Sequence, residues 1–234
     1  MNCFEAYTGS ISHASVKKEI ANNGFFVVDR PLPIDFCNNI IKFLDEFPEG
    51  SAEINYNGSE KRVYGSEKHC AEIASFKTFS DRLLSDVFER NVASSSTLAI
   101  RNLPLKSKKN AIKGRWHLDS FRRQIKVFLF LTDVSHSSGP LQLVKGSNKL
   151  QFKCANVAYG NVFSFKDLLW GKKTRLYQSI TDDAVEKIAG RGERVKSLIC
   201  EAGTVAIVDT SMLHRALPCE SQPRYALTGY YDSF

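Results

Sequence analysis

The sequence lacks a long hydrophobic run. Its longest apolar stretch, Val127–Leu131, is far shorter than the roughly 18 residues that a membrane-spanning helix needs. The N-terminal segment MNCFEAYTGS also lacks the apolar core that is typical of a secretory signal peptide. We therefore expect a cytoplasmic protein without a membrane span.

The chain also lacks any pair of cysteines spaced as CxxC, which argues against a zinc knuckle or a thioredoxin-like motif. A chain of 234 residues can bury a sizeable core without disulfides. We expect reduced thiols that serve mostly as small core residues. The cysteines are Cys3, Cys37, Cys70, Cys154, Cys200 and Cys219.

No RNP, zinc-finger or helix-turn-helix signature accompanies the formal net charge of +7. A basic balance favours an anionic partner. Without a recognition signature, however, a solvated basic surface explains the charge better than a nucleic-acid site does. A small molecule is therefore the expected partner, and the sequence does not encode the oligomeric state.

Length and composition fit one globular domain spanning residues 1–234, of which residues 16–92 are expected to be mainly helical support. Asp35 and Ser80 are interpreted as helix caps. The polar stretch 51–70 is expected to be a mobile connection or a lid. The expected elements are helices at 16–23, 36–47 and 71–92, and a buried strand at 25–28.

From residue 97 onward the pattern changes to strands. Short β-prone segments separated by Gly and Pro turns predict a mainly β fold, a sandwich or barrel with flanking helices. Residues 97–234 would form this core, with a mixed insertion at about 150–195 that contains a helix at Asp182–Ala189. The expected strands are 97–101, 124–131, 141–144, 195–199, 204–208 and 225–231.

The segment Trp116-His117-Leu118-Asp119 carries the first chemical signal. Residues i and i+2 of an extended segment point to the same side, so His117 and Asp119 can converge on one metal ion. Five histidines and twelve aspartates in this chain give an HxD match by chance about once in four random arrangements. The motif alone therefore favours a structural histidine beside a surface aspartate.

Two later residues strengthen the signal. His214 follows the β-prone segment 204–208, and Arg224 opens the last strand. Two histidines and one carboxylate with open positions are typical of non-haem Fe(II) oxygenases. The planar fork of an arginine suits the far carboxylate of a 2-oxoacid chelated to that iron. Alone, His214 would be a core histidine and Arg224 a surface arginine; together they favour a metal site.

From about residue 18 onward the chain resembles the phytanoyl-CoA dioxygenase family of Fe(II)/2-oxoglutarate-dependent oxygenases. The resemblance rests on four stretches: EIANNGFFVVD, WHLDS, IKVFLFLTDVSHSSGPLQLVKGSNK, and GTVAIVDTSMLHRALP with Arg224. It implies a double-stranded β-helix, or jelly roll, and an Fe(II)-dependent dioxygenase that consumes 2-oxoglutarate and O2. By position, His117, Asp119 and His214 would be the iron ligands, and Arg224 would bind the cosubstrate.

The resemblance also implies succinate and CO2 as products, with hydroxylation of a substrate C–H bond as the usual outcome. Halogenating relatives lack the carboxylate ligand, so Asp119 argues against chlorination. The family often has a hydroxylic residue two positions after the distal histidine. Here that residue is Ala216, and Arg101 or Thr132 could supply the missing donor.

Three residues beside the HxD motif are candidate substrate contacts: Trp116, Arg122 and Arg123. Trp116 could equally pack the barrel. The favoured function is hydroxylation of a small molecule, an anionic metabolite or a biosynthetic intermediate. The alternatives are the same chemistry on a nucleic acid or a protein side chain, and a barrel that binds metal or a 2-oxoacid without turnover. Basic residues before the motif motivate the nucleic-acid alternative: Lys106, Lys108, Lys109, Lys113 and Arg115.

Overall fold

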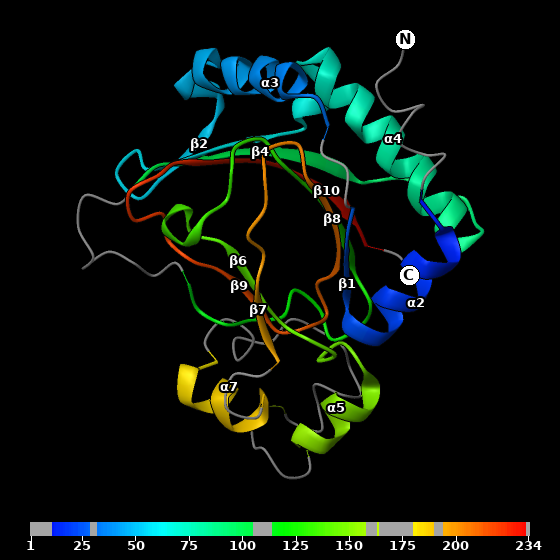
Figure 1. The fold of residues 1–234 in the computed structure, drawn as a ribbon. Helices are drawn as coiled ribbons and strands as arrows, with labels where there is room; N and C mark the ends of the chain where they lie inside the picture. The colour runs from blue at the N-terminus through cyan, green and yellow to red at the C-terminus, as the bar shows by residue number, and fades with distance from the viewer. Residues whose placement is uncertain are drawn as a thin grey trace.

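Two antiparallel sheets form the core of the computed structural model, which describes residues 11–28, 32–104, 114–157, 163, 180–189 and 194–232 (Figure 1). In the larger sheet the strand order is β1-β8-β5-β10-β4-β3-β2, and in the smaller it is β7-β6-β9. Strands distant in sequence are neighbours in space, as in a jelly roll. The bounds are β1 Phe25–Val27, β2 Glu53–Asn55, β3 Glu60–Tyr64, β4 Ser96–Asn102, β5 Ile125–Phe130, β6 Leu141–Val144, β7 Val195–Ser197, β8 Val205–Asp209, β9 His214–Ala216 and β10 Arg224–Tyr231.

The two sheets pack face to face around an apolar interior. Phe128, Ala206 and Ala226 of the larger sheet share one cluster with Leu141 and Leu143 of the smaller. Successive side chains of a strand point to opposite faces, so the residues between them lie on the outer face of the larger sheet. The structure is the mainly β, double-stranded β-helix that the sequence predicts.

Three helices cover the outer face of the larger sheet: α2 His13–Asn23, α3 Ile34–Glu46 and α4 Ala71–Phe88 (Figure 1). Each turns an apolar stripe to the sheet, as amphipathic surface helices do. The Ser12 side chain accepts a hydrogen bond from Ser15 N at the start of α2, and left-handed Gly24 ends that helix. Buried residues of the stripes include Ile20, Ile40, Leu44, Phe76 and Leu83.

Two further helices, α5 Leu150–Ala155 and α7 Asp182–Ala189, lie beside the smaller sheet at the bottom of Figure 1. Val185 of α7 packs against Val144 and Leu213 in a second apolar cluster. The expected helix at 182–189 is present with those bounds. Most of the expected insertion at 150–195, and the basic residues Lys106, Lys108, Lys109 and Lys113, lie outside the described residues.

All six strands expected after residue 97 are present, most of them within one or two residues of the expected bounds. The strand β9 was not expected, because only His214–Ala216 pairs there and the short stretch shows no alternation. Its register places His214 opposite Leu143 of the interior cluster.

The interpretation of residues 51–70 as a mobile connection or lid is wrong. This stretch contains β2 and β3, and β3 pairs with β4 along its whole length. Its charged residues form ion pairs within the stretch, since Arg62 Nε lies 3.0 Å from a Glu60 carboxylate oxygen. The N-terminal third is therefore helical only in part, because β1, β2 and β3 belong to the larger sheet.

Neither predicted cap is a cap. Helix α3 begins after Pro33, and Asp35 lies within its first turn. Ser80 lies in the middle of the continuous helix α4, where its hydroxyl donates to Phe76 O at 2.8 Å. A serine can bond the carbonyl four residues earlier inside a helix, so a serine before an apolar run does not by itself mark a helix start.

No helix in the described part of the chain is long and apolar enough to cross a membrane. The described cysteines are all free thiols, and Cys37 and Cys219 are the buried ones. Burial raises the pKa of the Cys37 thiol to about 11, so this residue is a protonated core side chain at neutral pH.

Candidate metal centre

His117 and His214 come together through the backbone. The N–H of each histidine donates to the carbonyl of the other at 3.0 Å, which forms an isolated antiparallel bridge at the edge of the smaller sheet. Residues paired across antiparallel strands direct their side chains to the same face. The two imidazole rings therefore lie together, with centroids 4.3 Å apart.

Asp119 joins them by the expected alternation. Its N–H donates to Thr210 O at 3.0 Å, which fixes the segment against the loop that precedes His214. The carboxylate oxygens lie 3.9 Å from His117 Nε2 and 3.6 Å from His214 Nε2. One ligand atom from each of the three residues lies within 4.8 Å of the others. This two-histidine, one-carboxylate set fits a non-haem iron with open positions.

Hydrogen bonds orient both imidazoles for metal binding. His117 Nδ1 lies 3.0 Å from Arg115 O, and His214 Nδ1 lies 2.9 Å from Met212 O. A carbonyl oxygen only accepts, so each Nδ1 carries the proton and each Nε2 keeps its lone pair. Metal-ligating histidines are commonly fixed in this way by a carbonyl partner.

The electrostatics of the site favour the protonation states that a metal requires. Burial lowers the pKa of His214 to about 4, although the Asp119 carboxylate acts in the opposite direction. Burial alone would raise the pKa of Asp119, but His214, Lys126 and His117 outweigh it and hold that pKa below its usual range. At neutral pH His214 is neutral and Asp119 is ionised, as ligands must be.

Lys126 is a residue of the site that the sequence did not single out. Its Nζ lies 2.6 Å from Asp119 Oδ2, and the lysine side chain is only 13% exposed. The same Nζ lies 4.7 Å above the ring centre of Tyr230, its partner on β10. The signal that could have identified it is a lysine at an inward-facing position of the otherwise apolar strand Ile125–Phe130.

Arg224 opens β10 and faces the interior, two residues before Ala226 of the interior cluster. The residue is 7% exposed, and its buried Nη1 has no hydrogen-bond partner among the described residues. A buried donor without a partner is costly, which fits a guanidinium that receives an anion. Thr132 Oγ1 accepts a hydrogen bond from Tyr225 N, one residue along.

Arg101 lies elsewhere. It pairs with Tyr225 in the β4–β10 register, and both side chains reach Asp45 of α3 on the outer face of the sheet, at 3.2 and 2.9 Å. The structure therefore does not bring Arg101 to the metal cluster. Strand alternation separates it from Arg224, and the exact register was the information that the sequence did not provide.

The three candidate substrate residues are also dispersed. Trp116 is buried in the cluster beside α7, with Nε1 donating to Asp182 Oδ1 at 2.9 Å. Arg123 Nε lies 3.4 Å from Asp209 Oδ2, and Arg122 is exposed. Trp116 thus packs the outside of the smaller sheet, because it alternates with His117 along the segment.

A jelly roll that holds two histidines and an aspartate together defines the class of iron- and 2-oxoglutarate-dependent oxygenases. The family model described as phytanoyl-CoA dioxygenase (PhyH) matches residues 21–225. The chain belongs to this family. No curated protein sequence matches it.

Solved structures of the same fold share little sequence with the chain. The epimerase SnoN, in complex with Fe3+, alpha ketoglutarate and nogalamycin RO, is 12% identical with a TM-score of 0.67, covering 94% of this chain and 83% of SnoN. HygX from Streptomyces hygroscopicus, with nickel and 2-oxoglutarate bound, is 12% identical with a TM-score of 0.63, covering 95% and 87%. A Pseudomonas putida prolyl-4-hydroxylase is 13% identical with a TM-score of 0.59, covering 95% and 100%.

Proposed function

We propose that this oxygenase hydroxylates a C–H bond of a small molecule, an anionic metabolite or a biosynthetic intermediate, with Fe(II), 2-oxoglutarate and O2. The observation that carries the proposal is the convergence of His117, Asp119 and His214, with Arg224 inside the same barrel. Bound iron, with 2-oxoglutarate and O2, supplies the oxidant that removes hydrogen from the substrate.

In this proposal the protein side chains bind, orient and exclude water. The three ligands would hold the iron and leave positions open for cosubstrate and oxygen. Arg224 binds the far carboxylate of 2-oxoglutarate with charge-assisted hydrogen bonds, and Thr132 supports that end. The interior residues Phe128 and Leu143 keep this part of the barrel dry, which strengthens each electrostatic contact.

The region around Lys126 supports a small, polar substrate. The pKa of Tyr230 is raised chiefly by burial, with Tyr64 and Asp119 as further neighbours. The Tyr230 ring beside Lys126 and Asp119 offers a ring face and a hydroxyl group, which suit a cyclic, polar molecule.

The comparisons support the same substrate class without naming a substrate. SnoN was crystallised with nogalamycin RO, a small molecule. The prolyl-4-hydroxylase motivates the main alternative, hydroxylation of a protein side chain. The nucleic-acid alternative rests on the basic residues before His117, and the non-catalytic alternative is a barrel that binds metal without turnover.

A succinate assay tests the proposed function. The protein is supplied with Fe(II), ascorbate, 2-oxoglutarate and O2, and with small carboxylates, amino acids and glycosylated compounds in turn. We expect Fe(II)-dependent succinate that rises several-fold with an accepted substrate, together with a product heavier by one oxygen atom. The His214→Ala variant should lose iron binding and turnover together.

The same assay separates the alternatives. Stimulation by peptides alone would favour the protein side chain as substrate. Salt-sensitive binding to DNA or RNA would favour a nucleic acid, since phosphate contacts release counterions. Metal binding without oxygen consumption in any mixture would reduce the protein to a binding barrel and overturn the proposal.

A further inference from the structure

We propose that Lys126 restrains the Asp119 carboxylate so that it gives the iron one oxygen only. The inference rests on the proposed function and assigns a positioning residue within that site. Nothing in the sequence pattern of the ligands identifies Lys126, which comes from the strand β5 rather than from either ligand segment.

The ion pair is directed at one atom of the carboxylate. Lys126 Nζ lies 2.6 Å from Asp119 Oδ2. Each carboxylate oxygen also faces one imidazole, since Oδ1 lies 3.9 Å from His117 Nε2 and Oδ2 lies 3.6 Å from His214 Nε2. The ammonium group acts as a point charge at close range to Oδ2. It would compete with a metal for Oδ2 and not for Oδ1, so Oδ1 is the oxygen left for a metal held by the two imidazoles.

Lys126 is itself held in place. Its neighbours on the same face of the strand are Phe128 and Phe130, which belong to the interior cluster, and the Tyr230 ring lies 4.7 Å from its Nζ. Burying a lysine costs free energy unless its charge is matched. An apolar side chain could pack at this position without that cost. The presence of a lysine is therefore explained by the carboxylate that it contacts.

Restraining the carboxylate keeps a coordination position open. An octahedral ion held by three protein ligands would have three further positions, of which a chelating 2-oxoacid would take two and O2 one. If both oxygens of Asp119 bound the ion, one of those positions would be filled. Lys126 therefore preserves the position that oxygen needs.

Water counting on a substitute metal tests this directly. Mn(II) replaces iron in the cosubstrate-free protein, and its bound waters are counted from the broadening of its electron paramagnetic resonance lines in water enriched in the magnetic oxygen isotope. We expect three waters in the wild type and in Lys126→Arg, which keeps the charge. We expect two in Lys126→Met, where the carboxylate is free to bind through both oxygens.

A matched control removes an equivalent ion pair elsewhere. Lys77 Nζ lies 2.6 Å from Asp81 Oδ2 on helix α4, away from the metal ligands. Lys77→Met should retain three waters. In turnover, Lys126→Met should lower kcat by 10-fold or more while the KM for 2-oxoglutarate changes little, because the chelating positions survive and the oxygen position does not.

The outcomes distinguish this inference from the proposed function. Three waters in folded Lys126→Met, or two in the wild type, would overturn the role of Lys126 while leaving the metal site intact. A wild type that binds no Mn(II) or Fe(II) would overturn the proposed function instead. If Lys126→Met does not fold, Lys126→Leu provides the second neutral variant, with the same expectation of two waters.

Discussion

At the scale of single residues, the cations Lys126, Arg224 and Lys153 have little exposure to solvent. Lys126 is matched by Asp119 at 2.6 Å. Arg224 leaves Nη1 without a hydrogen-bond partner among the described residues. Lys153 is 3% exposed, and its Nζ donates to Phe121 O at 2.8 Å. Charge inside a fold is costly unless it is paired, so each of these residues makes a separate prediction.

Arg224→Met should separate stability from binding. Without 2-oxoglutarate the variant should be at least as stable as the wild type, because a buried, incompletely bonded charge is removed. Its affinity for 2-oxoglutarate should fall about 100-fold, since charge-assisted hydrogen bonds contribute about 1.5–3 kcal/mol. Thermal unfolding with and without 2-oxoglutarate measures both. Unchanged affinity would exclude Arg224 from the cosubstrate site.

Lys153→Met should change how stability depends on pH. Burial lowers the pKa of Lys153 from 10.5 to about 8, with Asp209 opposing and Arg123 reinforcing the shift. Because the pKa is lower in the folded than in the unfolded protein, the charged lysine costs the folded state free energy. This cost is fully present below pH 8 and disappears as the pH rises to 10.5. The stability of the variant relative to wild type should therefore fall by roughly 2–3 kcal/mol between about pH 7 and about pH 10.

Urea unfolding of both proteins at the two pH values measures this difference, and other titrating groups cancel in the comparison. Lys42→Met is the control, because the Lys42 side chain is 73% exposed. An equal stability difference at both pH values would show that Lys153 is not perturbed by burial.

At the scale of elements, Arg215 of β9 contacts the segment that carries His117. The Arg215 guanidinium lies 4.4 Å from the Trp116 ring centre. It also donates to Gly114 O at 3.1 Å and to Asp182 Oδ1 at 2.6 Å. Arg215 thus links the two ligand segments to α7, on the face opposite to the metal ligands.

Arg215→Met should loosen both ligand segments. We expect a loss of about 1–3 kcal/mol in the free energy of unfolding from the broken charge-assisted bonds. Metal affinity should fall roughly 10-fold, as for other changes outside the ligand set. Chemical denaturation and Co(II) titration measure these effects. Exposed Arg194 provides the control variant Arg194→Met, and equal behaviour of the two variants would contradict the account.

The turn before β8 depends on a glycine. Gly203 has φ +85°, and a Cβ at this position would lie 2.2 Å from Leu32 O. Gly203→Ala should destabilise the protein by more than about 2 kcal/mol, because both conformation and space forbid the side chain. Gly58 has φ +87° with nothing within 4 Å of a Cβ, so Gly58→Ala should cost only about 1 kcal/mol. Similar melting temperatures would refute the steric argument.

Some strands of this fold could be predicted from the sequence and others could not. The strands from residue 97 onward were predictable because their apolar runs are bounded by Gly and Pro turns. The strands β2 and β3 were not, because Glu60, Arg62 and Lys61 make β3 look like a loop. Their charges are neutralised by contacts such as Arg62–Glu60, which depend on register and not on composition.

At the scale of the whole molecule, the jelly roll brings together residues that are far apart in the sequence. His117 and His214 meet because the segment that carries His117 pairs with β9, the edge strand of the smaller sheet. The ligand types and their alternation were readable from the sequence. Lys126 and the displacement of Arg101 to the outer face were not, since both depend on which strand face turns inward.

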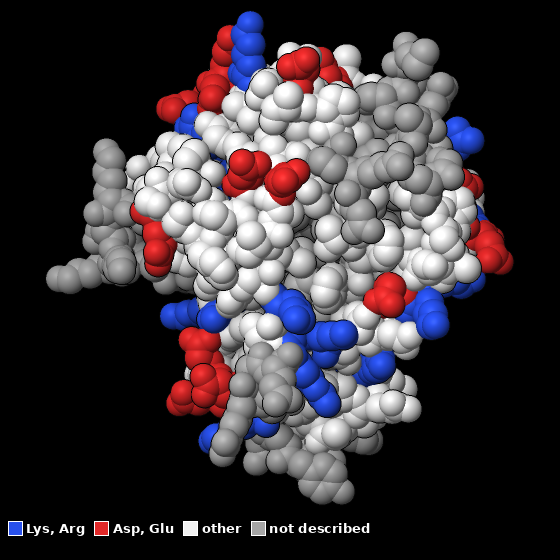
Figure 2. Space-filling model, in the orientation of Figure 1, with Lys and Arg blue, Asp and Glu red and all other residues white. Residues whose placement is uncertain are grey.

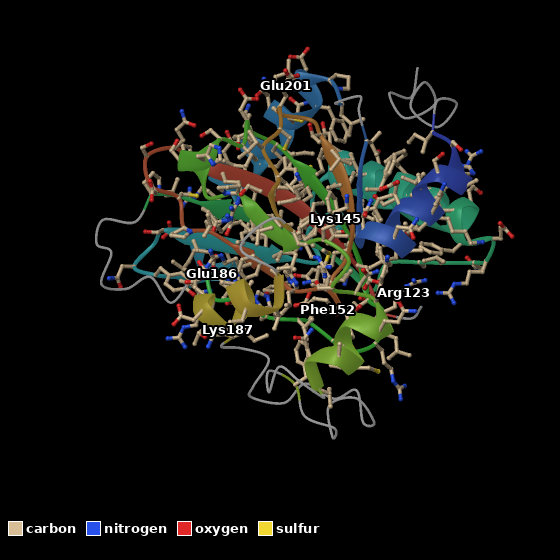
Figure 3. The ribbon with its side chains drawn as sticks, turned by 60° about the horizontal axis from the view of Figure 1, so that its bottom comes forward. Arg123, Lys145, Phe152, Glu186, Lys187 and Glu201 are labelled. Carbon is tan, nitrogen blue, oxygen red and sulfur yellow. The ribbon has the colours of Figure 1, made fainter. Side chains whose placement is uncertain are left out.

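The chain has a formal net charge of +7, and its charged residues are unevenly distributed over the face drawn in Figure 2. Lysines and arginines gather on the lower part of the face drawn in Figure 2, where α5 and α7 lie. Figure 3 labels Lys145, Phe152 and Lys187 there, and these residues border a hollow of about 1040 Å³. This basic region lies beside the smaller sheet and contains none of the metal ligands, so it does not explain the iron chemistry.

The central claim is that His117, Asp119, His214 and Arg224 together bind iron and 2-oxoglutarate. Its most direct test is anaerobic addition of 2-oxoglutarate to the Fe(II)-loaded protein, followed by visible absorption. We predict a charge-transfer band in the wild type, a band that needs about 100-fold more 2-oxoglutarate in Arg224→Met, and none in His214→Ala. No band in the folded wild type, or an unchanged band in His214→Ala, would contradict the account.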